Sequence, residues 1–189
     1  MKKVRLGLLF AGIGLFASSC IKDDEVKFTG SVVEFDAAVM NTNNAYMLPP
    51  DSIAFPILTR MPAIGRAVNT GDAMLTRTTT APVSLRVNLV GAQRKQATTV
   101  NYRTVNMNEY KLLGVASNLN EQAQPGTHYT ALSGTLTIPA DSSFGYINVP
   151  LMNSGVSSTT PREIVLMLTG GTDVTPSRNY KVVGLRVSQ

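Results

Sequence analysis

The chain has 189 residues, 43% of them hydrophobic and 15% charged, with one cysteine, one histidine and no tryptophan. One cysteine excludes a disulfide framework, and the length fits one ordinary domain with a hydrophobic core of its own. The formal net charge of +5 arises largely in residues 1–19, which hold three of the 17 Lys and Arg residues and none of the 12 acids; the other 14 basic residues do not form a stripe of the kind that binds nucleic acid, so we exclude that partner.

The first 19 residues have the composition of a signal peptide. A basic segment at 2–5 precedes an apolar run at 6–17, and this run is too short to span a hydrocarbon core of about 30 Å. Small residues at 17–19 stand before Cys20, as a signal peptidase requires. We therefore predict that residues 1–19 are a signal peptide.

The residues around Cys20 resemble a bacterial lipobox. The resemblance implies that the Cys20 thiol is linked to a diacylglycerol and that Cys20 becomes an acylated N-terminus. Several acyl chains hold a protein on a membrane where one chain gives only marginal binding. The alternative is an unmodified thiol beside an ordinary secretory cleavage site, which is unusual in an exported protein.

Residues 20–30 are predicted to form a flexible, lipidated tether that carries a run of charge. Lys22, Asp23, Asp24 and Glu25 follow the cysteine closely. This run resembles the lipoprotein export signal of Bacteroidota, which implies a lipid-anchored protein of the outer membrane that faces the cell exterior. A solvated, charged linker is the alternative.

Short apolar runs that alternate with polar residues dominate residues 31–189. Strict alternation is typical of half-buried strands, and Gly, Pro, Asn and Ser bound each run. We predict strands at 33–39, 52–58, 83–89, 100–102, 135–139, 145–151, 162–170 and 179–187. Pro56 indicates an edge or a bulge in the second of them. Seven or eight strands in one domain, residues 31–189, predict an antiparallel β-sandwich.

Two long polar stretches, 65–82 and 106–126, lack this periodicity. Loops of more than about 15 residues are usually functional or disordered, and the sequence leaves both possibilities open. A short helix at 109–116 is compatible with the second stretch, although its apolar face spans too few turns to be stable alone.

The second half of the chain contains, in order, a G-x-x-Y turn at 126–129, a strand that ends in I-P-A at 138–140 and an L-x-L strand at 162–170. This order resembles an uncharacterised family of Bacteroidota surface lipoproteins with immunoglobulin-like or Calx-β-like sandwiches. The resemblance covers about half of the chain. It implies an immunoglobulin-like fold and an association with glycan-uptake systems of the starch-utilisation type, which pair an outer-membrane transporter with companion surface lipoproteins. It implies no binding residues.

The residues needed for common metal sites and catalytic sites are scarce. Calx-β domains that bind calcium gather acids at one end, whereas the acids beyond the tether are dispersed here. A single histidine and a lipidated cysteine leave no zinc ligand set, and no G-x-S-x-G motif occurs. We expect no cofactor, no metal and no enzyme; an enzyme of unrecognised type is a weaker alternative. His128 is predicted to be a structural residue whose ring bonds a neighbouring backbone group.

Sugar binding would require aromatic faces for stacking and polar side chains for the hydroxyls. Tyr46 and Tyr110 lie among such polar residues and are the candidates for glycan contact. Both tyrosines are equally compatible with an ordinary half-buried position. Ser52 follows Asp51 in a tripeptide that resembles the O-glycosylation sequon of Bacteroidota, although Ser52 can equally begin a strand.

From these observations we predict a non-catalytic accessory module that binds a glycan or a partner protein in a nutrient-uptake assembly. The alternative is a structural or adhesin-type surface subunit that assembles by strand-edge pairing. Saturable sugar binding would distinguish the first function from the second.

Overall fold

The computed structural model describes residues 30–40, 44–48, 53–112 and 120–189. Strands make up most of the secondary structure in these residues. The elements are β1 (Val32–Phe35), α1 (Ala37–Met40), β2 (Asn44–Leu48), β3 (Ile53–Leu58), β4 (Val83–Val90), β5 (Thr98–Val105), the 3-10 helix η1 (Met107–Glu109), β6 (Lys111–Leu112), β7 (Glu121–Gln122), β8 (Thr135–Ile138), β9 (Phe144–Val149), β10 (Arg162–Gly170), β11 (Thr175–Pro176) and β12 (Val182–Val187).

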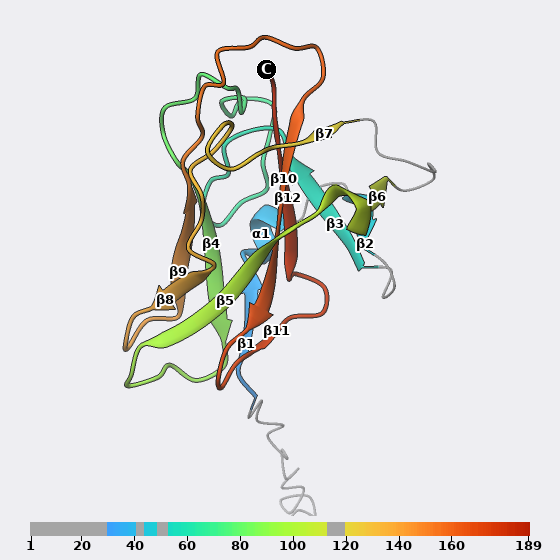
Figure 1. Ribbon diagram of the computed structural model, residues 1–189. Helices are drawn as coiled ribbons and strands as arrows, with labels where there is room; N and C mark the ends of the chain where they lie inside the picture. Colours follow the sequence, from blue (N-terminus) through green and yellow to red (C-terminus); the bar gives the residue numbers. More distant parts are fainter. Residues whose placement is uncertain (1–29, 41–43, 49–52, 113–119) are drawn as a thin grey trace, which may run out of the picture.

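The strands form two packed sheets (Figure 1). The smaller sheet has the order β11-β1-β4-β9, and the larger has the order β6-β2-β3-β12-β10-β5-β8 with β7 beside β10. The strand pairs are antiparallel except for β1 with β11, β3 with β12 and β7 with β10. Consecutive strands such as β4 and β5, or β8 and β9, lie in different sheets, as in immunoglobulin-like sandwiches. The predicted fold class is confirmed.

The main core lies between the two sheets and is built from the inward-facing residues of alternating strands. On β4 the inward-facing residues Val83, Leu85, Val87 and Leu89 are at most 5% exposed, whereas the residues between them are partly or fully exposed. Val87 of β4 belongs to the same cluster as Leu166 of β10 and Leu185 of β12. Burying each such side chain stabilises the fold by about 1.5–3 kcal/mol.

The structure contains more strands than the seven or eight that were predicted. The additional strands are β2 and the two-residue strands β6, β7 and β11. Each is too short, or too mixed in composition, for an alternation of apolar residues to identify it.

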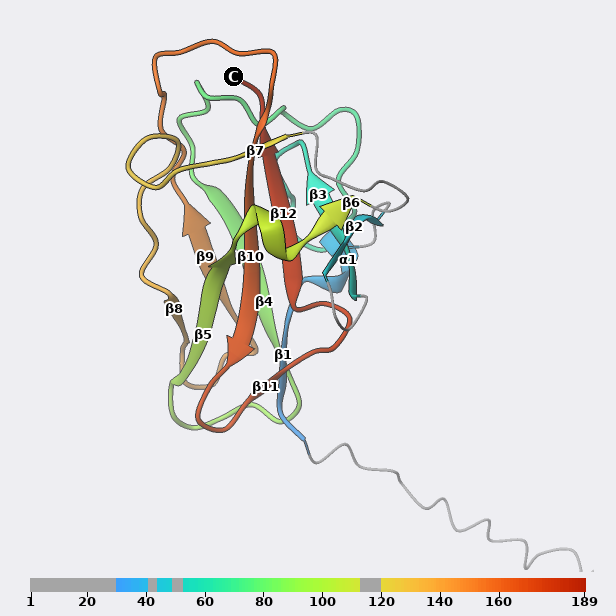
Figure 2. The same ribbon diagram turned by 45° about the vertical axis from the view of Figure 1, so that its right-hand side comes forward.

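A second hydrophobic cluster lies on the outer face of β10 and β12. Leu166 of β10 points into the main core, and its neighbour Val165 points to the opposite side. The chain after β5 crosses β10 and β12 in both ribbon views (Figures 1 and 2). It contributes Tyr110, which joins Val165 and Phe55 of β3 in the second cluster. The protein's own chain therefore covers this part of the larger sheet.

The predicted strand 33–39 was wrong in its second half, where α1 forms instead. The Asp36 carboxylate accepts hydrogen bonds from the backbone N–H of Ala38 at 3.0 Å and of Gly65 at 3.1 Å. A side chain that accepts from N–H groups at the start of a helix acts as an N-cap. The alternation of apolar residues continues through this capped turn and cannot reveal it.

Pro56 of β3 lies beside a bulge, and the strand that carries the extra residue is its partner β2. The register between β2 and β3 shifts between Asn44, which is opposite Pro56, and Tyr46, which is opposite Phe55. Beyond the bulge, the last two residues of β3 pair with β12. The bulge thus marks where β3 changes partner.

Loop 65–82 is attached to the sandwich by a buried side chain and by hydrogen bonds. Leu75 is 0% exposed and belongs to the main core. The Arg77 guanidinium donates to the side chains of Asn153 at 2.6 Å and Ser157 at 2.9 Å. The loop is therefore a structured part of the domain.

The stretch 106–126 is mostly irregular, and the helix considered at 109–116 does not form in the residues that are described. η1 ends at Glu109 and β6 follows as a strand; residues 113–119 lie outside the described part. The Glu109 side chain accepts from the backbone N–H of Asn106 at 2.8 Å, which holds the turn of η1. Within the described ranges, no helix has the length and hydropathy needed to cross a membrane.

Candidate functional site

Two aromatic rings lie side by side on the outer face of the smaller sheet. The strand alternation of β9 buries Gly145, Ile147 and Val149 and directs Phe144 and Tyr146 outward. The two rings are 36% and 37% exposed, and their centroids are 5.7 Å apart with an angle of 75° between the ring planes. They provide an accessible aromatic surface on a rigid strand.

β4 places polar side chains directly beside these rings. The antiparallel register of β4 and β9 sets Ser84 opposite Asn148, Arg86 opposite Tyr146 and Asn88 opposite Phe144. The Ser84 hydroxyl donates to the Asn148 side chain at 2.7 Å. The guanidinium carbon of Arg86 lies 4.3 Å from the centroid of the Phe144 ring, which is a cation–π contact. Together these six side chains form what we call the β4–β9 face.

Two polar atoms on the β4–β9 face are buried and unpaired. They are Nε of Arg86 and Oδ1 of Asn88, neither of which has a hydrogen-bond partner among the described residues. A buried polar group left in this state costs about 1–3 kcal/mol.

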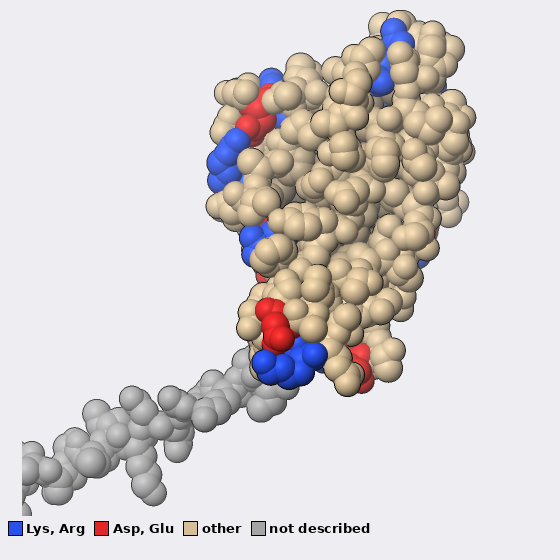
Figure 3. Space-filling view, turned by 90° about the vertical axis from the view of Figure 1, so that its left-hand side faces the viewer, with Lys and Arg blue, Asp and Glu red and all other residues tan. Residues whose placement is uncertain are grey.

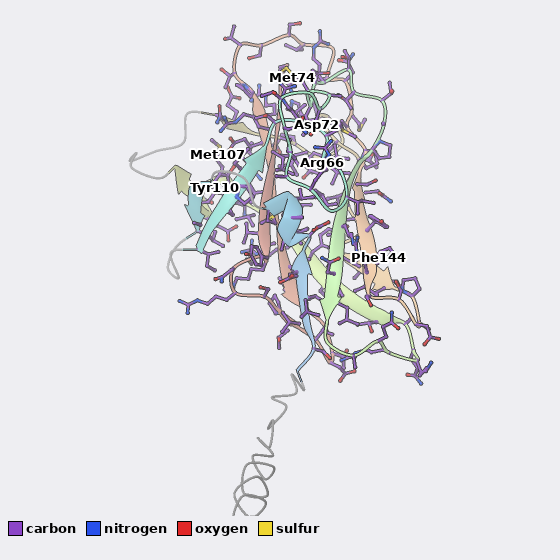
Figure 4. The ribbon with its side chains drawn as sticks, turned by 180° about the vertical axis from the view of Figure 1, so that it is seen from behind. Arg66, Asp72, Met74, Met107, Tyr110 and Phe144 are labelled. Carbon is purple, nitrogen blue, oxygen red and sulfur yellow. The ribbon has the colours of Figure 1, made fainter. Side chains whose placement is uncertain are left out.

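Arg86 is the charged side chain among the six of the β4–β9 face, and Glu34 of β1 lies beside it, opposite Asn88. Seen from the side of β8 and β9, most of the described surface is uncharged, and its charged residues lie toward the margins (Figure 3). Phe144 lies on the opposite side of the molecule from Tyr110 and Met107 (Figure 4). The face is thus distant from the second hydrophobic cluster.

Gly145 allows β9 to lie close to β8 at this edge of the sandwich. A Cβ atom at Gly145 would lie 2.8 Å from the carbonyl oxygen of Thr137 and 2.9 Å from Cδ1 of Leu136. Only glycine fits this contact without a shift of the backbone. The close packing fixes the strand that carries Phe144 and Tyr146.

Glu34 of β1 borders the face at the strand next to β4. Its Cα partner is Asn88. Partial burial raises the pKa of the Glu34 carboxyl above its ordinary value; a hydrogen bond with Ser177 opposes this shift, and the nearby Asp36 charge adds to it. Glu34 places negative charge on the β1 side of the face.

Tyr110, one of the two tyrosines predicted to contact glycan, lies in the interior. It is 4% exposed, and its ring packs edge-on against Phe55 with centroids 5.8 Å apart. Its hydroxyl donates to the Glu163 carboxylate at 3.0 Å. The ring is therefore part of the second cluster and offers no surface for stacking on a sugar.

Glu163 is buried and is the centre of a polar cluster. Its side chain is 0% exposed and pairs with Arg186, whose side chain is 29% exposed. One carboxylate oxygen accepts from Nε of Arg186 at 3.0 Å and from the Asn120 amide at 2.7 Å. Because β10 and β12 set these two residues opposite each other, the ion pair also fixes the strand register.

The remaining predicted site residues are only partly within the described structure. Tyr46 lies in β2 opposite Phe55, but its side chain is outside the described part. Cys20, the charged run 22–25 and Ser52 lie entirely outside the described residues. Lipidation, export and glycosylation at these positions stay predictions.

His128 has the structural role that the sequence predicted. Its Nδ1 accepts a hydrogen bond from the backbone N–H of Gln124 at 2.9 Å, which closes the turn before Tyr129. No group of three or more His, Cys, Asp or Glu residues with a metal-binding arrangement occurs among the described residues.

A groove of about 300 Å³ lies beside β5 in the larger sheet, lined by residues that include Tyr102, Arg103 and Tyr129. Arg103 is its one charged lining residue and is paired with Glu109 at 2.7 Å. Tyr102 and Tyr129 are 7% and 3% exposed. The groove therefore offers a sugar less accessible aromatic surface than the β4–β9 face does.

No protein-family model and no curated protein matches the chain. Among solved structures, a Bacteroides ovatus protein of unknown function is similar, with a TM-score of 0.50 and 13% identity over 85% of this chain and 52% of that one. A two-domain protein of unknown function from Bacteroides fragilis has a TM-score of 0.47 and 10% identity, over 84% of this chain and 45% of that protein. A Calx CBD2 domain has a TM-score of 0.41 and 14% identity, over 61% of this chain and 81% of that domain. The chain spans about half the length of the two Bacteroides proteins, and the likeness at 0.50 concerns the fold alone.

Alternation in the sequence predicted the strand β9, but its exposed aromatic residues were not among the predicted site residues. The signal was present in the alternation, because Phe144 and Tyr146 occupy the side of the strand opposite to Gly145, Ile147 and Val149. Aromatic residues on the polar side of an amphipathic strand indicate an exposed aromatic surface. Their pairing with β4 depends on strand register, which the sequence does not give.

Proposed function

We propose that the protein is a non-catalytic glycan-binding module and that the β4–β9 face is its binding surface. The observation that carries the proposal is the pair of exposed rings of Phe144 and Tyr146, with polar side chains of β4 set opposite them by the strand register. Sugars present flat C–H faces that stack on aromatic rings, and hydroxyls that need donors and acceptors.

A binding role suits this face better than hydrolysis. A glycosidase needs two carboxyl groups about 5–9 Å apart on either side of the bond that is cleaved. The groups gathered on the β4–β9 face are rings, amides, a hydroxyl and a guanidinium, with Glu34 at its border. These groups can orient a sugar but do not supply the acid and the base or nucleophile.

We propose further that the protein is a lipoprotein anchored through Cys20 on the outer face of the outer membrane. There it would present the β4–β9 face to extracellular glycans and act with an outer-membrane transporter and its companion lipoproteins. The lipobox-like residues and the charged run 22–25 support this location. Labelling with a radioactive fatty acid, and its loss in Cys20→Ala, would test the anchor.

Binding to a glycan array followed by calorimetry tests the function. Phe144→Ala and Tyr146→Ala should each weaken binding about three- to tenfold, because one aromatic contact contributes about 0.5–1.5 kcal/mol beyond its buried area. Tyr180→Ala is the matched control, because Tyr180 is also 37% exposed but its backbone borders β1, on the side away from β9. Equal loss in all three variants, or an array without any binding, would contradict the proposal.

One observation favours the alternative, a structural subunit that assembles through a sheet edge. β9 is the last strand of the smaller sheet, and it contains no Lys, Pro or other residue that commonly blocks edge pairing. Light scattering on the purified protein distinguishes the two functions. A stable dimer or polymer that Ile147→Pro abolishes, together with no sugar binding, would support the structural role.

A further inference from the structure

We infer that the ligand of the β4–β9 face is an acidic polysaccharide, and that Arg86 binds the carboxylate of a uronic acid residue. This inference rests on the proposed glycan-binding function and narrows it to a substrate class.

Arg86 forms no ion pair with any carboxylate in the described part of the chain. Other basic residues do so: the pairs are Arg66–Asp72, Arg94–Asp173, Lys95–Asp141, Arg103–Glu109, Arg162–Glu121 and Arg186–Glu163. Arg86 instead has the cation–π contact with Phe144. Its positive charge is therefore available to a negatively charged ligand.

The N–H groups of a guanidinium lie at the edge of its plane. Arg86 has the cation–π contact with Phe144 at 4.3 Å and no ion pair among the described residues, so its N–H groups other than the buried Nε remain for a ligand. Two parallel N–H groups match the two oxygens of a carboxylate. A carboxylate on a sugar that stacks on Tyr146, the residue opposite Arg86, would meet this edge.

The partial burial of Arg86 favours a charged ligand over a neutral one. Nε is buried and unpaired, and a cation that is partly removed from water is stabilised most by a hydrogen-bonded anion. A neutral sugar needs no guanidinium, because Asn88 and Asn148 already provide amide donors and acceptors on the same face. Arg86 thus adds a positive charge with N–H donors, and an acidic sugar would gain more binding energy from this group than a neutral sugar would.

Glu34 borders the face on its β1 side, and its carboxylate limits where the acidic group can lie. It faces Asn88 from β1 and is held by a hydrogen bond with Ser177. Its charge would repel a carboxylate above β1. The acidic group is therefore directed toward Arg86 and β9, which gives the bound chain a preferred position across the strands.

The test compares each acidic glycan with its own neutral counterpart. Oligogalacturonate, oligoalginate and oligoglucuronate are each measured by calorimetry against the same oligosaccharide after reduction of its carboxyl groups to alcohols. At least one acidic form should bind about tenfold or more tightly than its reduced form, because the charge-assisted pair with Arg86 is lost on reduction. Raising the salt concentration should reduce this preference.

Variants of the protein locate the effect. Arg86→Gln should remove the preference for the acidic form while leaving the weaker binding of the reduced form, and Arg86→Lys, which keeps the charge but not the planar group, should fall between the two. Arg103→Gln is the control, because it removes the same charge from β5 of the other sheet. Thermal unfolding of each variant shows whether it is folded.

The outcomes separate this inference from the function on which it rests. Equal binding of acidic and reduced forms, binding of neutral array glycans alone, or a preference that persists in Arg86→Gln would overturn the inference and leave a neutral-glycan module. If no glycan of either kind binds, the proposed function itself is overturned.

Discussion

Replacing Arg186 by Met should destabilise the protein more than replacing its partner Glu163. The Glu163 side chain is 0% exposed and cannot turn toward water, whereas the Arg186 side chain is 29% exposed and can. Loss of one partner of a buried ion pair costs about 3–5 kcal/mol, and we expect about 3 kcal/mol for Arg186→Met because Arg186 is only partly buried. For a domain of this size, this loss lowers Tm by about 6–12 °C.

The control for this prediction is the double variant Glu163→Met, Arg186→Met. Removing both charges together leaves no uncompensated carboxylate, so its stability should lie within about 1 kcal/mol of the wild-type value. Urea unfolding followed by circular dichroism measures all three variants and gives the coupling energy of the pair. If Arg186→Met costs less than Glu163→Met, the hydrogen bonds from Tyr110 and Asn120 are sufficient for the carboxylate, and our reasoning on its charge is refuted.

Three further predictions concern other parts of the fold. Gly145→Ala should lower stability by about 1–3 kcal/mol in thermal unfolding, because the new methyl group meets a carbonyl oxygen of β8; an unchanged Tm would show that β8 moves away freely. Asp36→Ala should cost about 1 kcal/mol in urea unfolding through loss of the cap of α1, and no cost would mean that the cap adds nothing. Hydrogen bonds from Arg66 lower the pKa of Asp72 to about 2; the stabilisation is therefore present above the ordinary value of 3.8 and is lost as the pH falls toward 2. NMR titration of the Asp72 carboxyl should show this, and Arg66→Gln should raise the pKa toward 3.8.

The sequence was sufficient to predict strands whose two sides differ in polarity. β4 and β10 were placed nearly to the residue, because alternating or continuous apolar runs bounded by turn residues reflect burial on one or both sides. The α-helical turn after β1 was missed, because the apolar alternation continues through it and one of the two hydrogen bonds to its capping residue Asp36 comes from Gly65, 29 residues away. Periodicity is a local signal and carries no information on such a contact.

The candidate site shows the same limit more strongly. Tyr110 was chosen for its polar neighbours along the chain, yet its burial depends on Phe55 and on Glu163, which is 53 positions away. The cation–π partner of Phe144 is Arg86, which lies on another strand. Which aromatic residues are exposed was decided by the pairing and packing of strands, and a single sequence does not specify these.

The position of Phe144 and Tyr146 also determines the valence of the molecule. Among the described residues, they are the exposed aromatic residues that lie on strands, and they form one site on one face. Under the proposed function, a single shallow site would give each molecule one weak attachment to a glycan. Strong capture would then require many copies that bind neighbouring repeats of the same polysaccharide. The density of the protein on the cell surface, more than the affinity of one copy, would determine how firmly the polymer is retained.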